Sequence, residues 1–170
     1  VIVGLAPAAN GANRTGRMFT GDRSGDWLYA AMHRAGLASQ AAAVACDDGL
    51  ELIDAWVTAP VRCAPPDNKP TTGERDNCAP FLERELKLLG EARVIVALGG
   101  FGWNCAISAL RAGGHEIPRP KPKFGHGAEV PIDRVTLLGS YHVSQQNTFT
   151  GRLTEAMLDA VFTRARILAN

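Results

Sequence analysis

The fold follows from one stretch, Arg93-Val-Ile-Val-Ala-Leu-Gly-Gly-Phe-Gly-Trp-Asn-Cys-Ala-Ile-Ser-Ala-Leu110. The apolar run from Arg93 to Leu98 predicts a strand, and Gly99-Gly100 predicts a turn after it. The segment from Trp103 to Leu110 then predicts a helix. A short apolar strand followed by a helix is the unit from which layered α/β proteins are built.

The same alternation continues on both sides of this stretch. Further strands are predicted at 1–5, 52–58 and 135–141, and the first of these suits burial on both faces. Helices are predicted from the cap Ser24 to the stop Gly36, from the capping box of Thr71 and Glu74 to about Gly90, and over 153–168. Pro80 must lie in the first turn of its helix or kink it. The pattern predicts an α/β layer fold with a largely parallel sheet.

Length and composition limit the possibilities further. The 170 residues allow one domain, and 46% hydrophobic and 21% charged residues are ordinary for a globular protein. The net charge of +1 means that any contact with nucleic acid must come from a local basic face or from backbone amides. No apolar run approaches the roughly 20 residues that span a bilayer, and no signal-like segment opens the chain. The chain opens on Val1-Ile2-Val3 without a methionine, so we expect further residues upstream.

Three loops follow predicted strands, at 6–23, 59–71 and 142–151, and we expect them to converge at the carboxyl edge of the sheet. The first loop is rich in small residues, which let a backbone approach a ligand closely. It lacks the Gly-Lys-Ser/Thr of a nucleotide-phosphate loop. Phe19 in this loop either stacks on a base or anchors the loop on the sheet edge. Arg14 and Arg17 are candidates for phosphate contacts, although surface arginines are often simply solvated.

The last loop is polar almost throughout and contains His142. A histidine at the carboxyl end of a strand can donate a hydrogen bond to charge that develops on a leaving group. The alternative is a surface loop in which Thr150 or Thr154 caps a helix. The four histidines lack the spacing of a metal site.

Three segments together resemble a known family. They are Gly4-Leu-Ala-Pro7, Asn13-Arg-Thr-Gly-Arg-Met-Phe-Thr-Gly-Asp22, and His142 followed by Ser144-Gln-Gln-Asn147. The chain resembles, over nearly its whole length, the family 5 uracil-DNA glycosylases (the UDGb group), and among them the actinobacterial members. The resemblance implies a three-layer α/β/α fold with a central four-stranded, mainly parallel sheet. It also implies base excision repair: a deaminated base is flipped out of DNA and its N-glycosidic bond is hydrolysed without a metal at the reaction centre.

The resemblance also implies roles for individual residues. Phe19 would stack on the flipped base, with the small Ala6 also in the base-binding set. His142 would bind the base oxygen that gains charge, and Asn147 would hold the loop and contact the DNA or the pocket. The DNA-binding set would be Arg14, Arg17, Ser144, Gln145 and Gln146.

Three positions depart from the family pattern. Asn13 lies where many members carry an aspartate that positions or activates water, and an amide cannot act as a general base. Ala59 lies where related glycosylases carry an asparagine that pairs with the edge of uracil. Val143 replaces a usual proline. Because the aspartate and the asparagine are both missing, we expect modest rates and relaxed base choice.

The four cysteines, without a secretory signal, indicate a reducing compartment, where they are metal ligands or packed thiols. Under the resemblance, Cys63 and Cys78, with fourteen residues between them, match the second pair of ligands of a four-cysteine [4Fe-4S] cluster. The first pair would then lie upstream of Val1. Cys46 and Cys105 are expected to be packed thiols.

Two functions remain open at this point. The first is a monofunctional glycosylase that releases uracil and other deaminated or etheno bases: hypoxanthine, xanthine and ethenocytosine. The alternative is a DNA-binding iron–sulfur protein of the same fold with weak or no catalysis. In both cases we expect a monomer in the bacterial cytoplasm that binds DNA containing deaminated bases and has no membrane partner.

Overall fold

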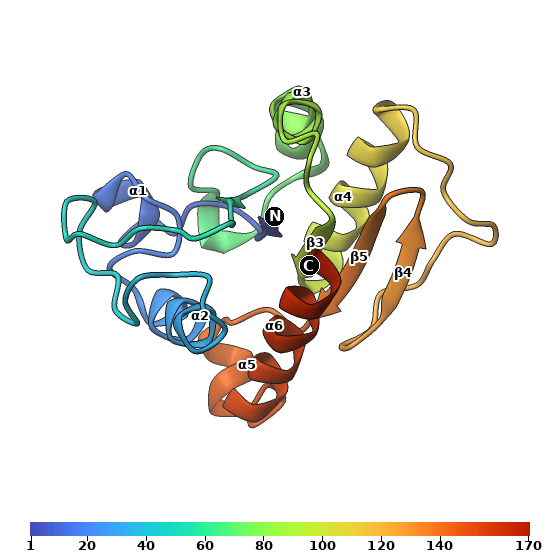
Figure 1. Ribbon diagram of the computed structural model, residues 1–170. Helices are drawn as coiled ribbons and strands as arrows, with labels where there is room; N and C mark the ends of the chain where they lie inside the picture. Colours follow the sequence, from blue (N-terminus) through green and yellow to red (C-terminus); the bar gives the residue numbers. More distant parts are fainter.

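A five-stranded sheet lies between two layers of helices in the computed structural model, which describes residues 1–170 (Figure 1). The strands are β1 (Ile2–Val3), β2 (Val57–Thr58), β3 (Val94–Leu98), β4 (Glu129–Ile132) and β5 (Val135–Ser140). Their spatial order is β2-β1-β3-β5-β4. The first four in that order are parallel, and β4 runs antiparallel to β5. The three-layer, mainly parallel prediction is confirmed, with one antiparallel edge strand added to the expected four.

The helices divide between the two faces of the sheet. They are α1 (Ala12–Thr15), α2 (Arg23–Arg34), α3 (Thr72–Leu88), α4 (Gly99–Ala112), α5 (Gln145–Phe149) and α6 (Glu155–Ala169), with a short 3₁₀ helix at Pro66–Asn68. Helices α2 and α6 pack together on one face, and α3 and α4 pack together on the other (Figure 1). No helix combines the length and the apolarity that crossing a membrane requires.

The central strand β3 contributes to both hydrophobic cores. Val94, Val96 and Leu98 belong to the core beneath α2 and α6, whereas Ile95 and Ala97 belong to the core beneath α3 and α4. Successive side chains of a strand point to opposite faces, so a strand covered on both faces is apolar at every position. This is why the stretch around β3 predicts the layered fold so directly.

The edges of the sheet differ from the prediction. Of the predicted strand 52–58, only Val57 and Thr58 join the sheet, because Leu52 instead forms an isolated antiparallel bridge with Ala38. Strand β4 was not predicted, since its sequence contains Pro131 and alternates in exposure, as edge strands do. A two-residue turn, Asp133-Arg134, joins β4 to β5 at the amino edge of the sheet.

Helix ends were predicted with mixed success. The capping box of α3 is confirmed: Glu74 N donates to Thr71 Oγ1 (3.2 Å), and Thr71 N donates to the Glu74 carboxylate (2.7 Å). Pro80 lies well inside α3 rather than in its first turn. Helix α2 is capped by Asp22, not by Ser24, because the Asp22 carboxylate accepts a hydrogen bond from Gly25 N (3.0 Å).

The predicted turn at Gly99-Gly100 is instead the start of α4. Gly99 has a φ of +88°, which lets the chain pass from β3 into the helix without a separate loop. Gly102 lets that helix approach β1, since a Cβ there would lie 2.8 Å from the carbonyl oxygen of Gly4. The junction therefore brings the beginning of α4 directly under the carboxyl edge of the sheet.

Candidate active site

The three predicted loops meet at the carboxyl edge. The loop after β1 bonds to the loop after β2, because Val61 N donates to Leu5 O (3.3 Å). The loop after β1 also meets the loop after β5, since the rings of Phe19 and His142 are 6.1 Å apart between centroids. A Cβ at Gly99 would lie 3.4 Å from the Cβ of His142, so α4 supports that histidine from below. The expected convergence is confirmed.

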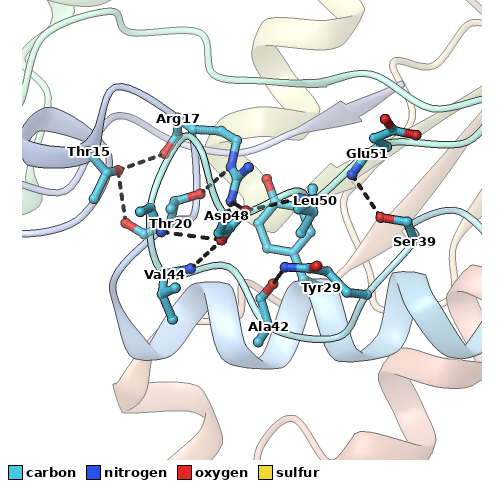
Figure 2. Close-up of polar contacts among 12 residues, drawn as sticks. Thr15, Arg17, Thr20, Tyr29, Ser39, Ala42, Val44, Asp48, Leu50 and Glu51 are labelled. Atoms are coloured by element: carbon cyan, nitrogen blue, oxygen red, sulfur yellow. Dashed lines mark hydrogen bonds and ion pairs between the residues drawn. The ribbon is translucent and has the colours of Figure 1, made fainter.

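A part-buried ion pair between Arg17 and Asp48 holds the first loop in place. Arg17 donates to both carboxylate oxygens of Asp48 (2.8 Å each), and its Nε donates to Thr20 Oγ1 (2.9 Å), as Figure 2 shows. Burial alone would raise the pKa of Asp48, but hydrogen bonds hold that pKa well below its usual range. They come from Arg17 and from the backbone amides of Leu50, Val44 and Ala45. A contact between Arg17 and phosphate stays a prediction; in this structure the Arg17 guanidinium is paired with Asp48, which lies outside the first loop.

Phe19 takes a strained conformation at the end of this loop. Its φ is +54°, in the left-handed region that bulky residues rarely adopt. Gly25 in α2 makes the conformation possible, since a Cβ at that position would collide with the Phe19 carbonyl oxygen. Strain of this kind collects at functional sites, where surrounding structure maintains it.

The ring of Phe19 is only 5% exposed and joins the core beneath α2 and α6. It lies over Gly4, where a Cβ would come within 2.7 Å of the ring. Of the two sequence interpretations, the one in which Phe19 anchors the loop is confirmed. Phe19 is an anchor on the sheet edge, and it also lies beside His142, where a base held by that histidine would meet it. Its stacking on a base stays a prediction.

His142 presents a buried nitrogen without a partner. Its Nε2 is closed to solvent and has no hydrogen bond, one of only two such side-chain atoms in the chain. Burial lowers the pKa of His142 to about 4, so the imidazole is neutral near pH 7. Buried polar atoms in native proteins are nearly always paired, and an unpaired one calls for an explanation such as a ligand. A neutral imidazole can supply a hydrogen bond to an oxygen placed there.

Helix α5 lies just after His142 and fixes its position. The Asn147 side chain donates to the His142 carbonyl oxygen (2.8 Å), which ties the two ends of the loop together. Ser144 is the N-cap residue of α5, and Gln145 and Gln146 are exposed in its first turn. These three positions could meet DNA at the carboxyl edge; the contacts themselves stay predictions.

Asn13 and Ala59 line one pocket of about 310 Å³ between the first two loops. Asn13 is exposed on α1, whereas Ala59 is buried directly after β2. Ala6 is part-buried in the first loop, and Arg14 is exposed on α1 without an acidic partner. The pocket also contains Arg62, which the sequence interpretation missed.

The cysteines are all free thiols. Cys105 is buried, which raises the pKa of its thiol to about 11 and confirms the packed-thiol prediction. Cys46 is exposed, so the same prediction was wrong for it, because the segment before Asp48 turns outward. Cys63 is exposed in the loop after β2, and Cys78 is part-buried in α3. No group of three or more possible metal ligands occurs within residues 1–170.

Comparison with known proteins places this site in a family. The sequence model of the Uracil DNA glycosylase superfamily matches residues 1–166. The Type-5 uracil-DNA glycosylase of Thermus thermophilus is 48% identical over 172 residues, covering 99% of this chain and 75% of that protein. The chain belongs to the type-5 family of uracil-DNA glycosylases.

Other members of the family differ from the chain in length. The Type-5 uracil-DNA glycosylase of Mycobacterium bovis is 57% identical over 171 residues, which cover 99% of this chain and 62% of that protein. The Pyrobaculum aerophilum protein of the same name is 42% identical, with coverages of 97% and 70%. The chain therefore spans about three-fifths of the length of the mycobacterial member.

Acid should destabilise the protein through His142. The folded state takes up this proton only below about pH 4, whereas the unfolded chain takes it up below about pH 6.5. Between those values the unfolded state binds more protons, so the free energy of unfolding falls as the pH falls through this window. At about 1.4 kcal/mol per pKa unit, we expect a His142 contribution of roughly 2–3 kcal/mol between pH 7 and pH 4.5. Urea unfolding of the wild type and His142→Gln at both pH values measures it; equal pH dependence in the two proteins would contradict it.

Proposed function

We propose that this chain hydrolyses the N-glycosidic bond of uracil in DNA after the base has been flipped out of the duplex. We extend the proposal to hypoxanthine, xanthine and ethenocytosine. Family membership supports the reaction class, since the named relatives are uracil-DNA glycosylases. The observation that carries the proposal is the unpaired, buried Nε2 of the neutral His142 at the carboxyl edge.

His142 would act on the departing base. As the glycosidic bond breaks, its electron pair leaves with the base, and negative charge builds on a base carbonyl oxygen. A hydrogen bond from the imidazole to that oxygen stabilises the charge as it forms, and burial strengthens the interaction. The bond from Asn147 to the His142 carbonyl holds the donor in place beforehand. The sugar is left cationic, and its anomeric carbon forms a bond to a water oxygen; the proton that the water loses balances the proton that the released base anion takes up.

Asn13 and Ala59 would set the limits of this catalysis. The Asn13 amide can orient water in the pocket but cannot take its proton, so attack depends on the reactivity of the sugar cation. Ala59 offers no hydrogen bond from its side chain to the edge of a base. We therefore propose modest rates and relaxed base choice.

The DNA would lie across the carboxyl edge. Arg14 on α1 and Gln145 and Gln146 on α5 are exposed there, on the two loops that meet at Phe19 and His142. We propose that they contact the DNA backbone of a single bound monomer. With a net charge of +1, such local contacts must supply the attraction.

We also propose that Cys63 and Cys78 are two of the four thiolate ligands of a [4Fe-4S] cluster. Arg62 next to Cys63 lies 5.8 Å above the ring of Phe81, which is one turn after Cys78 in α3. The loop that carries one cysteine is thus packed on the helix that carries the other. Both are free thiols, as ligands require. The remaining two thiolates are proposed to lie outside residues 1–170, and the cluster would be structural.

Iron content tests this ligand pair. In the full-length protein, Cys63→Ala and Cys78→Ala should each lose most of the iron and the visible colour, because a cluster needs all four thiolates. Cys46→Ala is the matched control, since it removes another exposed thiol and should leave iron unchanged. Normal iron in both test variants would remove these residues from the ligand set.

The reaction itself is tested by single-turnover assays on a uracil-containing oligonucleotide in EDTA. We expect release of uracil and an abasic site, with strand breakage only after alkali. Breakage before alkali, or dependence on added Mg²⁺, would overturn the reaction class. Tight binding of the oligonucleotide with no release of uracil would instead favour the alternative, a DNA-binding iron–sulfur protein without catalysis.

A further inference from the structure

Arg62 contains the second of the two buried side-chain atoms that lack a partner. Its Nε is closed to solvent and unbonded, as is Nε2 of His142. Arg62 lines the same pocket as Asn13 and Ala59. Both unpaired atoms of the chain therefore belong to the loops that form the candidate active site. A buried donor without a partner is costly in free energy, so an acceptor in the pocket would stabilise the complex by pairing with it.

The rest of the Arg62 side chain is firmly held. Its NH1 and NH2 donate to the two carboxylate oxygens of Glu85 (3.1 and 2.7 Å), and its guanidinium lies over the ring of Phe81. Thr58, at the end of β2, donates to the same carboxylate (2.6 Å). Thus α3 and β2 fix the guanidinium together. Its Nε is a donor in a fixed position rather than the end of a mobile side chain.

The surroundings favour a neutral acceptor for this donor. Glu85 already balances the charge of Arg62, so the pair as a whole has little attraction for a phosphate. The phosphates of DNA also lie on the outside of the double helix, whereas Nε of Arg62 is buried in the protein. Ala59, three residues earlier in the same loop, also lines the pocket and has no hydrogen-bonding group in its side chain. A base carbonyl oxygen fits these conditions.

We propose that Arg62 Nε–H donates to the exocyclic oxygen that deamination creates, O4 of uracil or O6 of hypoxanthine. The inference rests on the proposed function. Guanidinium has donors and no acceptor. It therefore pairs with an oxo group but opposes the amino group that cytosine or adenine carries at the same place. One residue would thus accept deaminated bases of both sizes and reject their parents, without the asparagine that Ala59 replaces.

The test compares uracil with 2-pyrimidinone, which is uracil without O4, in the same oligonucleotide. Single-turnover rates are measured for the wild type and for Arg62→Lys, which keeps a cation for Glu85 but has no Nε. For each protein we take the ratio of the rate on uracil to the rate on 2-pyrimidinone. The intrinsic difference between the two leaving groups is the same for every protein, so it cancels when this ratio is compared between the variant and the wild type. Arg84→Lys, at an exposed arginine of α3, is the matched control. Circular dichroism melting checks that each variant folds.

We expect the uracil to 2-pyrimidinone ratio to fall about 10-fold in Arg62→Lys and to stay unchanged in Arg84→Lys. A uniform loss on both bases, or no change, would overturn the role of Arg62 while the proposed function stands. A wild type that releases neither base overturns both. If Arg62→Lys does not fold, the double variant Arg62→Met/Glu85→Gln removes both charges together and gives the same comparison.

Discussion

The variant His142→Ala should release uracil about 10²–10³ times more slowly than the wild type in single-turnover assays. This is the usual cost of removing one fixed donor that faces developing charge. Affinity for undamaged DNA should hardly change, because Nε2 is buried and has no access to phosphates. His33→Ala is the matched control. Because His33 is exposed on α2, this variant should release uracil at the wild-type rate.

A second variant, His142→Asn, separates a catalytic role of His142 from a purely structural one. If the histidine only filled space beside Phe19, His142→Asn would restore most of the rate after His142→Ala had lost part of it. We expect both variants to be slow, because an asparagine is too short to bring a donor to the position of Nε2. A rate for His142→Ala within a factor of three of the wild type would refute the assigned role.

Restoring the missing amide, as Ala59→Asn, should shift base choice toward uracil. An asparagine amide donates and accepts at once, which fits the edge of uracil and misfits hypoxanthine. A bidentate contact of this kind discriminates by about 1–3 kcal/mol, or roughly 5- to 150-fold. Ala59 is 1% exposed, so the larger side chain will also crowd the pocket and reduce the absolute rate on both bases.

The measurement is the ratio of single-turnover rates on uracil and hypoxanthine opposite the same partner base. Ala59→Ser serves as the control, because it adds a smaller polar group that cannot make both bonds. If Ala59→Asn leaves the ratio where it was, residue 59 does not face the base and the match of this loop to the family is mistaken.

Local patterns in the sequence predicted the layers and the meeting of the loops. The apolar run at β3 indicates a strand that is buried on both faces. The capping box at Thr71 needs only residues within four positions of one another. His142 could be singled out because a strand ends just before it, and parallel strands bring their carboxyl ends to one edge. Each of these inferences needs only neighbours in sequence.

Pairs formed over long sequence separations could not be predicted in this way. Arg17 finds Asp48 across 31 residues, and Arg62 finds Glu85 across 23. Neither segment contains a sequence pattern that identifies its partner, so neither ion pair was predicted and Arg62 was overlooked. The strained φ of Phe19 likewise depends on Gly25, which only the folded chain brings beneath it.

The antiparallel strand β4 provides a site at which the protein can be attached to a surface. Its turn, Asp133-Arg134, is exposed and lies at the amino edge, the far end of the sheet from Phe19 and His142. A peptide tag inserted there could attach the protein to a glass surface with its reactive side turned toward solution. Single molecules held by this corner could then be watched as they capture and release labelled DNA.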